Sequence, residues 1–304
     1  MKRMLITIDT EGDNLWNWDK KSTISTDNTA FLSRFQNLCN EFGFKPTWLA
    51  NYEMISDPLF VDFVTGAVNR NQAELGMHLH AWNTPPIYNL NNCYNSLPYL
   101  IEYPSEIMDE KIRVMTELIK NKTGIQPVSH RAGRWAMNDQ YFELLLKYGY
   151  TVDCSVTPHV DWRNNTGATQ NSKGTDYSNY PEEPYYYQGL LEVPVTIRRT
   201  HTVFGDSFRT KFKNAIKGST VWLRPRKNNL QQMKWLADYV VESQTDYIMF
   251  MLHSSEMMPG GSPTFQTKED IEKLYADIAV LFKHMSKEYE GSTLKEYYKY
   301  KSGK

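Results

Sequence analysis

The sequence lacks the features that mark secreted, membrane-embedded and nucleic-acid-binding proteins. Its three cysteines, Cys39, Cys93 and Cys154, are widely spaced without a CxxC pair, which argues against a disulfide framework and favours reduced, mostly buried thiols. The densest apolar run, YIMFML at 247–252, is far shorter than the roughly 18 residues of a membrane helix. The formal net charge is -1, so the chain has no electrostatic footprint for nucleic acid or an anionic membrane.

Several targeting and catalytic motifs are also missing. The start, MKRMLITIDTEGD, has an apolar run that is too short for the core of a signal peptide. There is no GxGxxG or GxxxxGKS/T phosphate loop, no GxSxG nucleophile elbow and no HExxH helix. We therefore expect a soluble, cytoplasmic protein with no nucleic-acid partner and no membrane span, acting on a neutral or mildly charged substrate.

The composition is that of an ordinary globular protein with an excess of aromatic residues. Hydrophobic residues make up 40% and charged residues 23%, which is enough to bury a sizeable core. The 20 tyrosines and 8 tryptophans suit the flat faces of sugar rings, and they suit a tyrosine-rich core and surface equally well.

Short β-rich runs alternate with stretches long enough for a helix. The candidate strands are residues 4–9, 45–50, 74–80, 127–133, 150–155, 190–196, 220–225 and 247–253. The candidate helices are residues 28–42, 57–72, 105–122, 138–148, 228–243 and 268–289. Repeated strand-helix units predict parallel strands joined by right-handed crossovers. We expect an α/β fold, a single distorted (β/α)7-8 barrel domain formed by residues 1–304.

Two stretches interrupt this alternation. Residues 83–104 and 156–188 are rich in Pro, Asn, Gly and Tyr, and neither has the length or hydrophobicity of an independent domain. Long irregular loops in a compact domain often serve as lids or binding loops, so we interpret both as loop insertions. The Lys/Tyr-rich tail after residue 295 is interpreted as a frayed terminus.

Acidic side chains follow the first candidate strand directly. In TIDTEGD, residues 7–13, Asp9 and Glu11 are two positions apart and therefore share one face of the strand. In a parallel barrel the carboxyl ends of the strands form the catalytic face, where the two carboxylates can converge on one site. The alternative is a solvated acidic turn between strand and loop.

A pair of histidines closes the third candidate strand. His78 and His80, in ELGMHLHAW at 74–82, have the same spacing, so both imidazoles can face one metal ion. Catalytic zinc typically takes three protein ligands from His and carboxylate side chains and keeps a fourth position for water. Glu11, His78 and His80 supply such a set. Zn2+ is the expected ion, with Co2+, Mn2+ and Ni2+ as alternatives.

Two further strands end in a basic residue. Arg131, in HRAGRW at 130–135, suits contact with a carboxylate and would keep a catalytic Asp ionised, while a surface ion pair is the alternative. His253, in MLHSSEMMPGG at 251–261, follows a buried apolar run and has a pKa range suited to general acid catalysis. The alternative for His253 is a core histidine.

These four clusters, in this order and each at the end of a candidate strand, resemble the polysaccharide deacetylase family, the NodB-homology carbohydrate esterases. The resemblance spans residues 4–255. It implies that Asp9 is the catalytic base, that Arg131 orients it, that His253 is the general acid and that His78 binds the metal.

The chain departs from the family pattern at the metal site. Glu11 stands where the family more often has Asp, with one residue inserted between the two acids. One residue separates His78 from His80, where the family usually has three, and position 82 is Trp. Such variants resemble the subgroup associated with bacterial surface-polysaccharide assembly. The resemblance therefore implies an acetylated sugar or oligosaccharide substrate.

The reaction that the resemblance implies is metal-dependent removal of an N-acetyl group from a sugar, with release of acetate. A different amide, an O-acetyl ester and a catalytically silent carbohydrate-binding homologue remain as alternatives. The candidate substrate contacts are Trp82, Trp135, Asp153, Trp162 and Glu256. Each has a structural alternative, which is core packing for the tryptophans and turn formation for Asp153.

Overall fold

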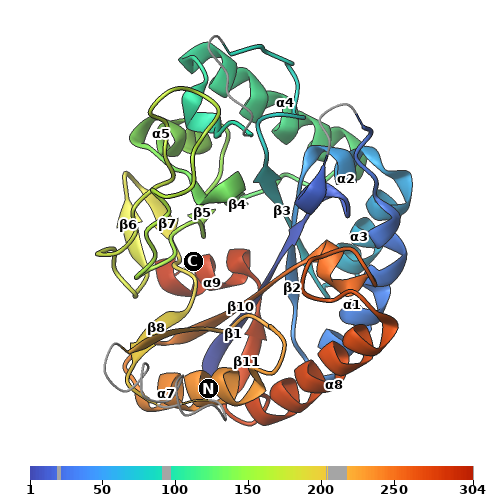
Figure 1. Ribbon diagram of the computed structural model, residues 1–304, viewed down its shortest axis with the longest axis vertical. Coiled ribbons are helices and arrows are strands. Elements are labelled where there is room, and N and C mark those ends of the chain that lie inside the picture. The colour runs from blue at the N-terminus through green and yellow to red at the C-terminus, as the bar shows by residue number, and fades with distance from the viewer. Residues whose placement is uncertain (19–21, 91–96, 203, 205–217, 304) are drawn as a thin grey trace.

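A curled, mainly parallel β-sheet organises the fold (Figure 1). The structure is a computed structural model and describes residues 1–18, 22–90, 97–202, 204 and 218–303. The strands of the main sheet are β1 (Lys2–Thr10), β2 (Pro46–Ala50), β3 (Glu74–Leu79), β4 (Ser129–Ala132), β5 (Val152–Asp153), β6 (Tyr185–Tyr187), β7 (Leu190–Glu192), β10 (Tyr247–His253) and β11 (Tyr289–Ser292). They follow the order β10-β1-β2-β3-β4-β5-β7-β6, and β11 pairs with the first half of β1.

Helices cover the outer face of this sheet. The α-helices are α1 (Leu32–Glu41), α2 (Tyr52–Ser56), α3 (Pro58–Asn69), α4 (Ser105–Thr123), α5 (Asp139–Lys147), α7 (Leu230–Glu242), α8 (Lys268–Met285) and α9 (Leu294–Ser302). The 3-10 helices are η1 (Leu15–Asn17), η2 (Asp27–Phe31), η3 (Leu100–Glu102), η4 (Gly133–Trp135) and η5 (Ser254–Met257). In Figure 1, α1, α3, α4, α7 and α8 surround the strands, and α9 lies inside that ring.

Side-chain alternation along the strands divides the interior into two cores. On β1, Ile6 and Ile8 belong to the core under the helices, whereas Leu5 belongs to the core enclosed by the curled sheet. Because the side-chain period of a strand is two, Thr7 and Asp9 share the enclosed face with Leu5. Both faces of β1 are buried beyond its first two residues, which explains why apolar residues occupy both faces in the run MLI and why Thr7 and Asp9 are buried polar residues.

Helix α9 closes the end of the enclosed space at which the strands begin. Leu294 and Tyr297 are fully buried there, in the same core as Tyr247 at the start of β10. A capping box formed by Thr293 and Glu296 starts the helix. The expectation of a frayed tail was therefore wrong. Two buried positions among lysines and tyrosines are too few to produce a recognisable periodic pattern.

The sheet curls, but its strand pairing does not run around a complete barrel. The predicted series of parallel strands is confirmed from β10 through β7, whereas a closed (β/α)7-8 barrel is not. The side between β7 and β10 holds a separate antiparallel pair, β8 (Ile197–Thr200) and β9 (Ser219–Trp222). This pair reaches β10 through isolated hydrogen bonds, such as that from Met251 N to Leu223 O at 3.2 Å. Residues 220–225 thus include a strand, but one outside the main sheet.

Three smaller expectations can be compared with the structure. Apart from isolated bridges, residues 154–184 contain neither helix nor strand, as expected for most of the second loop insertion. Cys39 and Cys154 are buried, free thiols, and Cys93 lies outside the described residues. Among the helices of the described residues, none combines the length and the apolar character needed to span a bilayer.

Candidate active site

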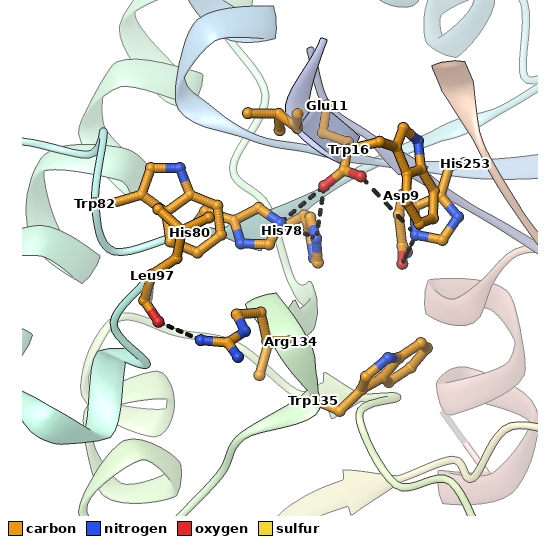
Figure 2. A pocket seen from close by; sticks show the side chains of 12 residues that line it. Asp9, Glu11, Trp16, His78, His80, Trp82, Leu97, Arg134, Trp135 and His253 are labelled. Atoms are coloured by element: carbon orange, nitrogen blue, oxygen red, sulfur yellow. Dashed lines mark hydrogen bonds and ion pairs between the residues drawn. The ribbon is translucent and has the colours of Figure 1, made fainter. Parts of the chain in front are cut away.

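The carboxyl ends of β1, β3, β4 and β10 meet around a cavity of about 220 Å³ (Figure 2). The residues that line it are Asp9, Glu11, Leu15, Trp16, His78, His80, Trp82, Leu97, Ala132, Arg134, Trp135 and His253. The residues predicted to form the reactive centre therefore share one cavity, except for Arg131, which lies buried behind Asp9.

Glu11, His78 and His80 converge on one point in this cavity. The Nε2 atom of His80 lies 2.7 Å from Oε2 of Glu11 and 3.1 Å from Nε2 of His78. The third separation, between Nε2 of His78 and Oε2 of Glu11, is 3.6 Å. Ligand atoms held about 2.1 Å from one zinc ion, at right angles or tetrahedral angles, are about 3.0–3.4 Å apart. The three observed separations, 2.7, 3.1 and 3.6 Å, bracket this range, so the group could hold a single divalent ion after small shifts of the side chains.

The protonation of these groups also suits a metal ion. Nδ1 of His78 donates to the main-chain carbonyl of Arg131 at 3.0 Å, which directs Nε2 toward His80 and Glu11. Burial acts to lower the pKa of His78, but the charges of Asp9 and Glu11 bring it above its ordinary value. Burial lowers the pKa of His80, which favours its neutral ring. Burial acts to raise the pKa of Glu11, but hydrogen bonds from His78 and His80 hold it well below its ordinary value. A cation at this point would take the place of the proton that the carboxylates favour on His78, and one carboxylate with two imidazoles is a zinc donor set.

Polar side chains from distant segments position these ligands. The main-chain N–H of Glu11 donates to Oγ of Ser254 at 3.1 Å, and its carbonyl accepts from Nδ2 of Asn28 at 2.8 Å. The main-chain N–H of His80 donates to Oδ1 of Asn51 at 3.2 Å. Asn28, Asn51 and Ser254 are fully buried, so their hydrogen bonds are protected from water.

A buried ion pair fixes the orientation of Asp9. Nη1 of Arg131 lies 2.5 Å from Oδ1 of Asp9, and the two side chains are 0% and 2% exposed. Arg131 also donates to Oγ1 of Thr7 at 2.8 Å and to the carbonyl of Cys154 at 3.1 Å. Burial acts to raise the pKa of Asp9, but the charge of Arg131 brings it below its ordinary value. These contacts hold the carboxylate of Asp9 in one orientation.

His253 lies opposite Asp9, since the parallel register of β1 and β10 pairs these two residues. Its Nε2 atom is 3.7 Å from Oδ2 of Asp9. On the other side of the ring, Nδ1 lies 3.1 Å from both Oε2 of Glu256 and Nη2 of Arg224. Burial acts to raise the pKa of Glu256, but the charge of Arg224 and the hydrogen bonds of His253 lower it to about 2. Nδ1 of His253 is therefore held by Glu256 and Arg224, whereas Nε2 faces the cavity.

Of the five predicted substrate contacts, some line the cavity and others lie outside its lining. Trp82 and Trp135 line the cavity, and Figure 2 shows them on opposite sides of it. Trp162 lies in a second layer, parallel to Trp135 at a centroid distance of 6.4 Å. Glu256 is 2% exposed and contacts Nδ1 of His253, so it lies behind that ring and outside the lining of the cavity.

Asp153 lies on the face of β5 that points away from the cavity. Val152 and Cys154 belong to the enclosed core, so the residue between them points in the opposite direction. Its carboxylate lies 2.6 Å from Nδ1 of His130 and accepts the main-chain N–H of Ser155 at 2.9 Å. Asp153 is fully buried, and the structure places it outside the lining of the cavity.

The sequence interpretation missed Trp16, Arg134 and Arg224. Arg224 falls near the end of the candidate strand 220–225 and just beyond β9. Its position at a strand end is the same signal that identified Arg131, so it could have been found from the sequence. Trp16 and Arg134 belong to short 3-10 helices after β1 and β4, where no sequence periodicity indicates the direction of a side chain.

Comparison with known proteins gives matches at the level of structure. The sequence matches no protein-family model and no curated protein. A structure assigned to the polysaccharide deacetylases, from Mycobacterium smegmatis, is 14% identical with a TM-score of 0.53, over 100% of this chain and 92% of the other. A 4-alpha-glucanotransferase from Thermococcus litoralis is 14% identical with a TM-score of 0.56, over 98% of this chain but 40% of the other.

At such identities the likeness establishes the fold, and the function has to be argued from the site. The match to the first structure covers nearly the full length of both chains. The family resemblance carried by the four sequence clusters is thereby confirmed at the level of the fold, and the chain has the mixed α/β fold of a polysaccharide deacetylase.

Proposed function

We propose that this chain is a metal-dependent carbohydrate deacetylase, which hydrolyses an acetyl amide of a sugar or oligosaccharide and releases acetate. The observation that supports the proposal most is the gathering of a metal-ligand set, an ionised Asp9 and the Nε2 atom of His253 around one cavity. A protein that only binds carbohydrate needs neither a base nor an acid at that position.

Glu11, His78 and His80 would hold the ion, and their mixture of one carboxylate and two imidazoles favours Zn2+. When bound, such an ion acidifies water and stabilises the negative charge that develops on the acetyl oxygen. Within the described residues, Glu11, His78 and His80 are the only such group of ligand atoms. An ion held by these three side chains would keep a coordination position for water or substrate.

Asp9 is suited to act as the base. Oδ1 is occupied by Arg131, whereas Oδ2 lies on the side of His253 and the cavity. Its lowered pKa keeps the carboxylate ionised at neutral pH. Oδ2 would take a proton from water as that water attacks the acetyl carbon, and Arg131 would prevent the carboxylate from rotating.

His253 is suited to act as the acid, and its position favours an amide over an ester. The nitrogen of an amide must gain a proton before it can leave as an amine, whereas an alcohol leaves with less assistance. Nε2 of His253 points into the cavity on the side of Asp9 (Figure 2), where it can donate that proton. The product amine then carries the proton away.

The cavity walls suit a sugar ring. Trp16, Trp82 and Trp135 surround the reactive groups, and their flat faces can stack against the C–H groups of a pyranose. A cavity of about 220 Å³ is below the range of roughly 300–1,000 Å³ for drug-sized ligands. It therefore suits one acetylated ring, with the remainder of an oligosaccharide outside.

Acetate release from N-acetylated sugars by the zinc-loaded protein tests the proposal. Asp9→Asn and His253→Gln should each lower kcat/KM by about 10²- to 10⁴-fold, because each removes one proton-transfer group. Asp161→Asn is the matched control, since Asp161 pairs with Arg163 on a surface loop outside the cavity. Equal rates in wild type and Asp9→Asn would remove Asp9 from its role. O-acetylated sugars, run in parallel, report the preference between amide and ester.

A further inference from the structure

One charged side chain in the cavity has no part in the reaction described above. Arg134 lines the cavity across from Glu11, His78 and His80, as Figure 2 shows. We propose that Arg134 binds an anionic group of the substrate, so that the sugar carries a carboxylate or a phosphate in addition to its acetyl group. This inference rests on the proposed function, because it names the substrate class of the same site.

The contacts of Arg134 hold its position without neutralising its charge. Nη2 donates to the carbonyl of Thr166 at 2.8 Å, and Nη1 donates to the carbonyl of Leu97. The guanidinium lies over the ring of Tyr99, with its carbon 4.1 Å from the ring centroid. These are neutral partners that use part of the donor set. A guanidinium has five N–H donors, so others remain for a ligand.

No carboxylate within the described part of the chain forms an ion pair with Arg134. Glu102 acts on it electrostatically, but its carboxylate is committed elsewhere. It accepts the main-chain N–H groups of Tyr99 (2.5 Å), Ala168 (3.1 Å) and Thr169 (2.8 Å). Burial lowers the pKa of Arg134, although Tyr99 and Glu102 act to raise it. A half-buried guanidinium whose hydrogen bonds go to neutral carbonyls is a suitable place for an anion.

The backbone directs Arg134 into the cavity at an energetic cost. Arg134 and Trp135 have φ angles of 57° and 62°, a left-handed conformation that costs roughly 1–2 kcal/mol for each residue with a side chain. The preceding Gly133 packs so tightly that an added Cβ would lie 2.6 Å from Nδ1 of His80. The segment that carries Arg134 is therefore fixed directly against a metal ligand. Strain of this kind is concentrated at ligand-binding sites.

A purely structural role for Arg134 is the competing explanation. Its two carbonyl partners, Leu97 and Thr166, belong to the two loop insertions, so the side chain also joins these loops. Uncharged donors such as Gln serve that purpose without placing an unpaired charge beside the cavity. A structural role predicts equal losses for all substrates on substitution, whereas an anion-binding role predicts a loss of discrimination.

The experiment compares three probes that share one acetylated ring. These are N-acetylglucosamine, its 1-phosphate, and the corresponding 6-carboxylate, N-acetylglucosaminuronic acid. Binding to the zinc-loaded protein is followed by tryptophan fluorescence, and acetate release is measured in parallel. We expect at least one anionic probe to bind about 10- to 100-fold more tightly than the neutral one, as for a charge-assisted hydrogen bond.

Two substitutions identify Arg134 as the source of this preference. Arg134→Gln should bring the ratio of anionic to neutral affinity close to one. Arg134→Lys should keep more of a preference for phosphate than for carboxylate, since only arginine binds a carboxylate in a bidentate manner. The control is Arg163→Gln, which removes the same charge from an exposed ion pair with Asp161 and Asp176. It should leave the ratio unchanged.

Each outcome has one meaning. Two results would overturn the anion site. One is a wild type that binds neither anionic probe more tightly than the neutral probe. The other is an equal loss of affinity for all three probes in Arg134→Gln. A binding preference that depends on Arg134, without acetate release from any probe, would support the anion site and contradict the proposed deacetylase activity.

Discussion

The imidazole rings of His78 and His80 meet edge to face, and their Nε2 atoms are 3.1 Å apart beside the carboxylate of Glu11. Both rings are buried, and burial lowers the pKa of His80. The charges of Asp9 and Glu11 raise the pKa of His78 although burial acts to lower it, so positive charge is favoured at this point. A divalent cation between the two imidazoles would use both lone pairs and the negative charge of Glu11.

Zinc should therefore stabilise the folded protein. At a zinc concentration of 100 times Kd, binding adds about 2.7 kcal/mol to the free energy of unfolding. For a domain of this size that corresponds to a rise in Tm of roughly 5 °C, measured by thermal unfolding of chelator-treated protein with and without zinc. The variant Glu11→Gln should lose most of this rise. His284→Gln, at an exposed ion pair on α8, should retain it. Identical rises in all three proteins would argue against the site.

Loss of Arg131 should destabilise the protein strongly. Arg131→Met leaves the carboxylate of Asp9 buried and unpaired, which is expected to lower the free energy of unfolding by about 3–5 kcal/mol. The double variant with Asp9→Asn should recover part of that loss. Urea unfolding of metal-free protein measures both. Arg34→Met is the control, because its pair with Glu272 is exposed and worth about 1 kcal/mol or less. Losses of equal size would contradict this account of the pair.

A single methyl group at position 133 should disturb the metal ligands. In Gly133→Ala the added Cβ would lie 2.4 Å from the carbonyl oxygen of Leu79 and 2.6 Å from Nδ1 of His80. His80 must then move, so zinc affinity should fall by about 10- to 100-fold, as when the supporting contacts of a metal ligand are lost. Gly66→Ala on α3 is the control, since its Cβ would meet only the flexible end of Arg70. Unchanged zinc affinity in Gly133→Ala would show that the site tolerates this shift.

Lys111 should make stability depend on alkaline pH. Its Nζ atom donates to the carbonyls of Thr84 (2.5 Å) and Pro86 (2.7 Å), and burial lowers its pKa from 10.5 to about 8. Between those two values the unfolded chain binds more protons than the folded one, so stability should rise with pH. The difference in unfolding free energy between wild type and Lys111→Met should increase over this window.

The control for this pH dependence is Lys147→Met. The hydrogen bond to Asp109 raises the pKa of Lys147 above its ordinary value, so its contribution should stay constant until the pH passes that value. A flat difference for Lys111→Met over the same window would mean that its ammonium group remains charged in the folded protein.

The convergence of the candidate site residues could be predicted because strand geometry determines where their side chains point. Asp9 and Glu11, like His78 and His80, are two positions apart and therefore leave the end of a strand on the same side. His253 joins them because β10 lies beside β1 in a parallel register. The sequence does not determine a strand order by itself; the expected barrel would bring its last strand beside its first, and β10 and β1 are neighbours here although the sheet does not close.

Asp153 shows where this reasoning reached its limit. Both faces of a parallel strand are buried, so the residues of β5 show no alternation of polar and apolar character from which a direction can be read. Arg134 and Trp162 lie outside strands, and their directions depend on loop conformation. Arg224 differs, because a strand end was predicted around it, but the antiparallel pairing of β8 with β9 was not.

The pairing of β1 with β10 joins parts of the chain that are far apart in sequence. The hydrogen bond from Oγ1 of Thr7 to the carbonyl of Phe250 spans 243 positions. Contacts of such long range slow folding more than they affect stability, because the chain must close a large loop before they form. Asp9 and His253 come from these two strands, so a partly folded chain without this pairing has no reactive pair. During refolding, the proposed acetate release should therefore appear with the docking of β10 on β1, later than collapse and helix formation.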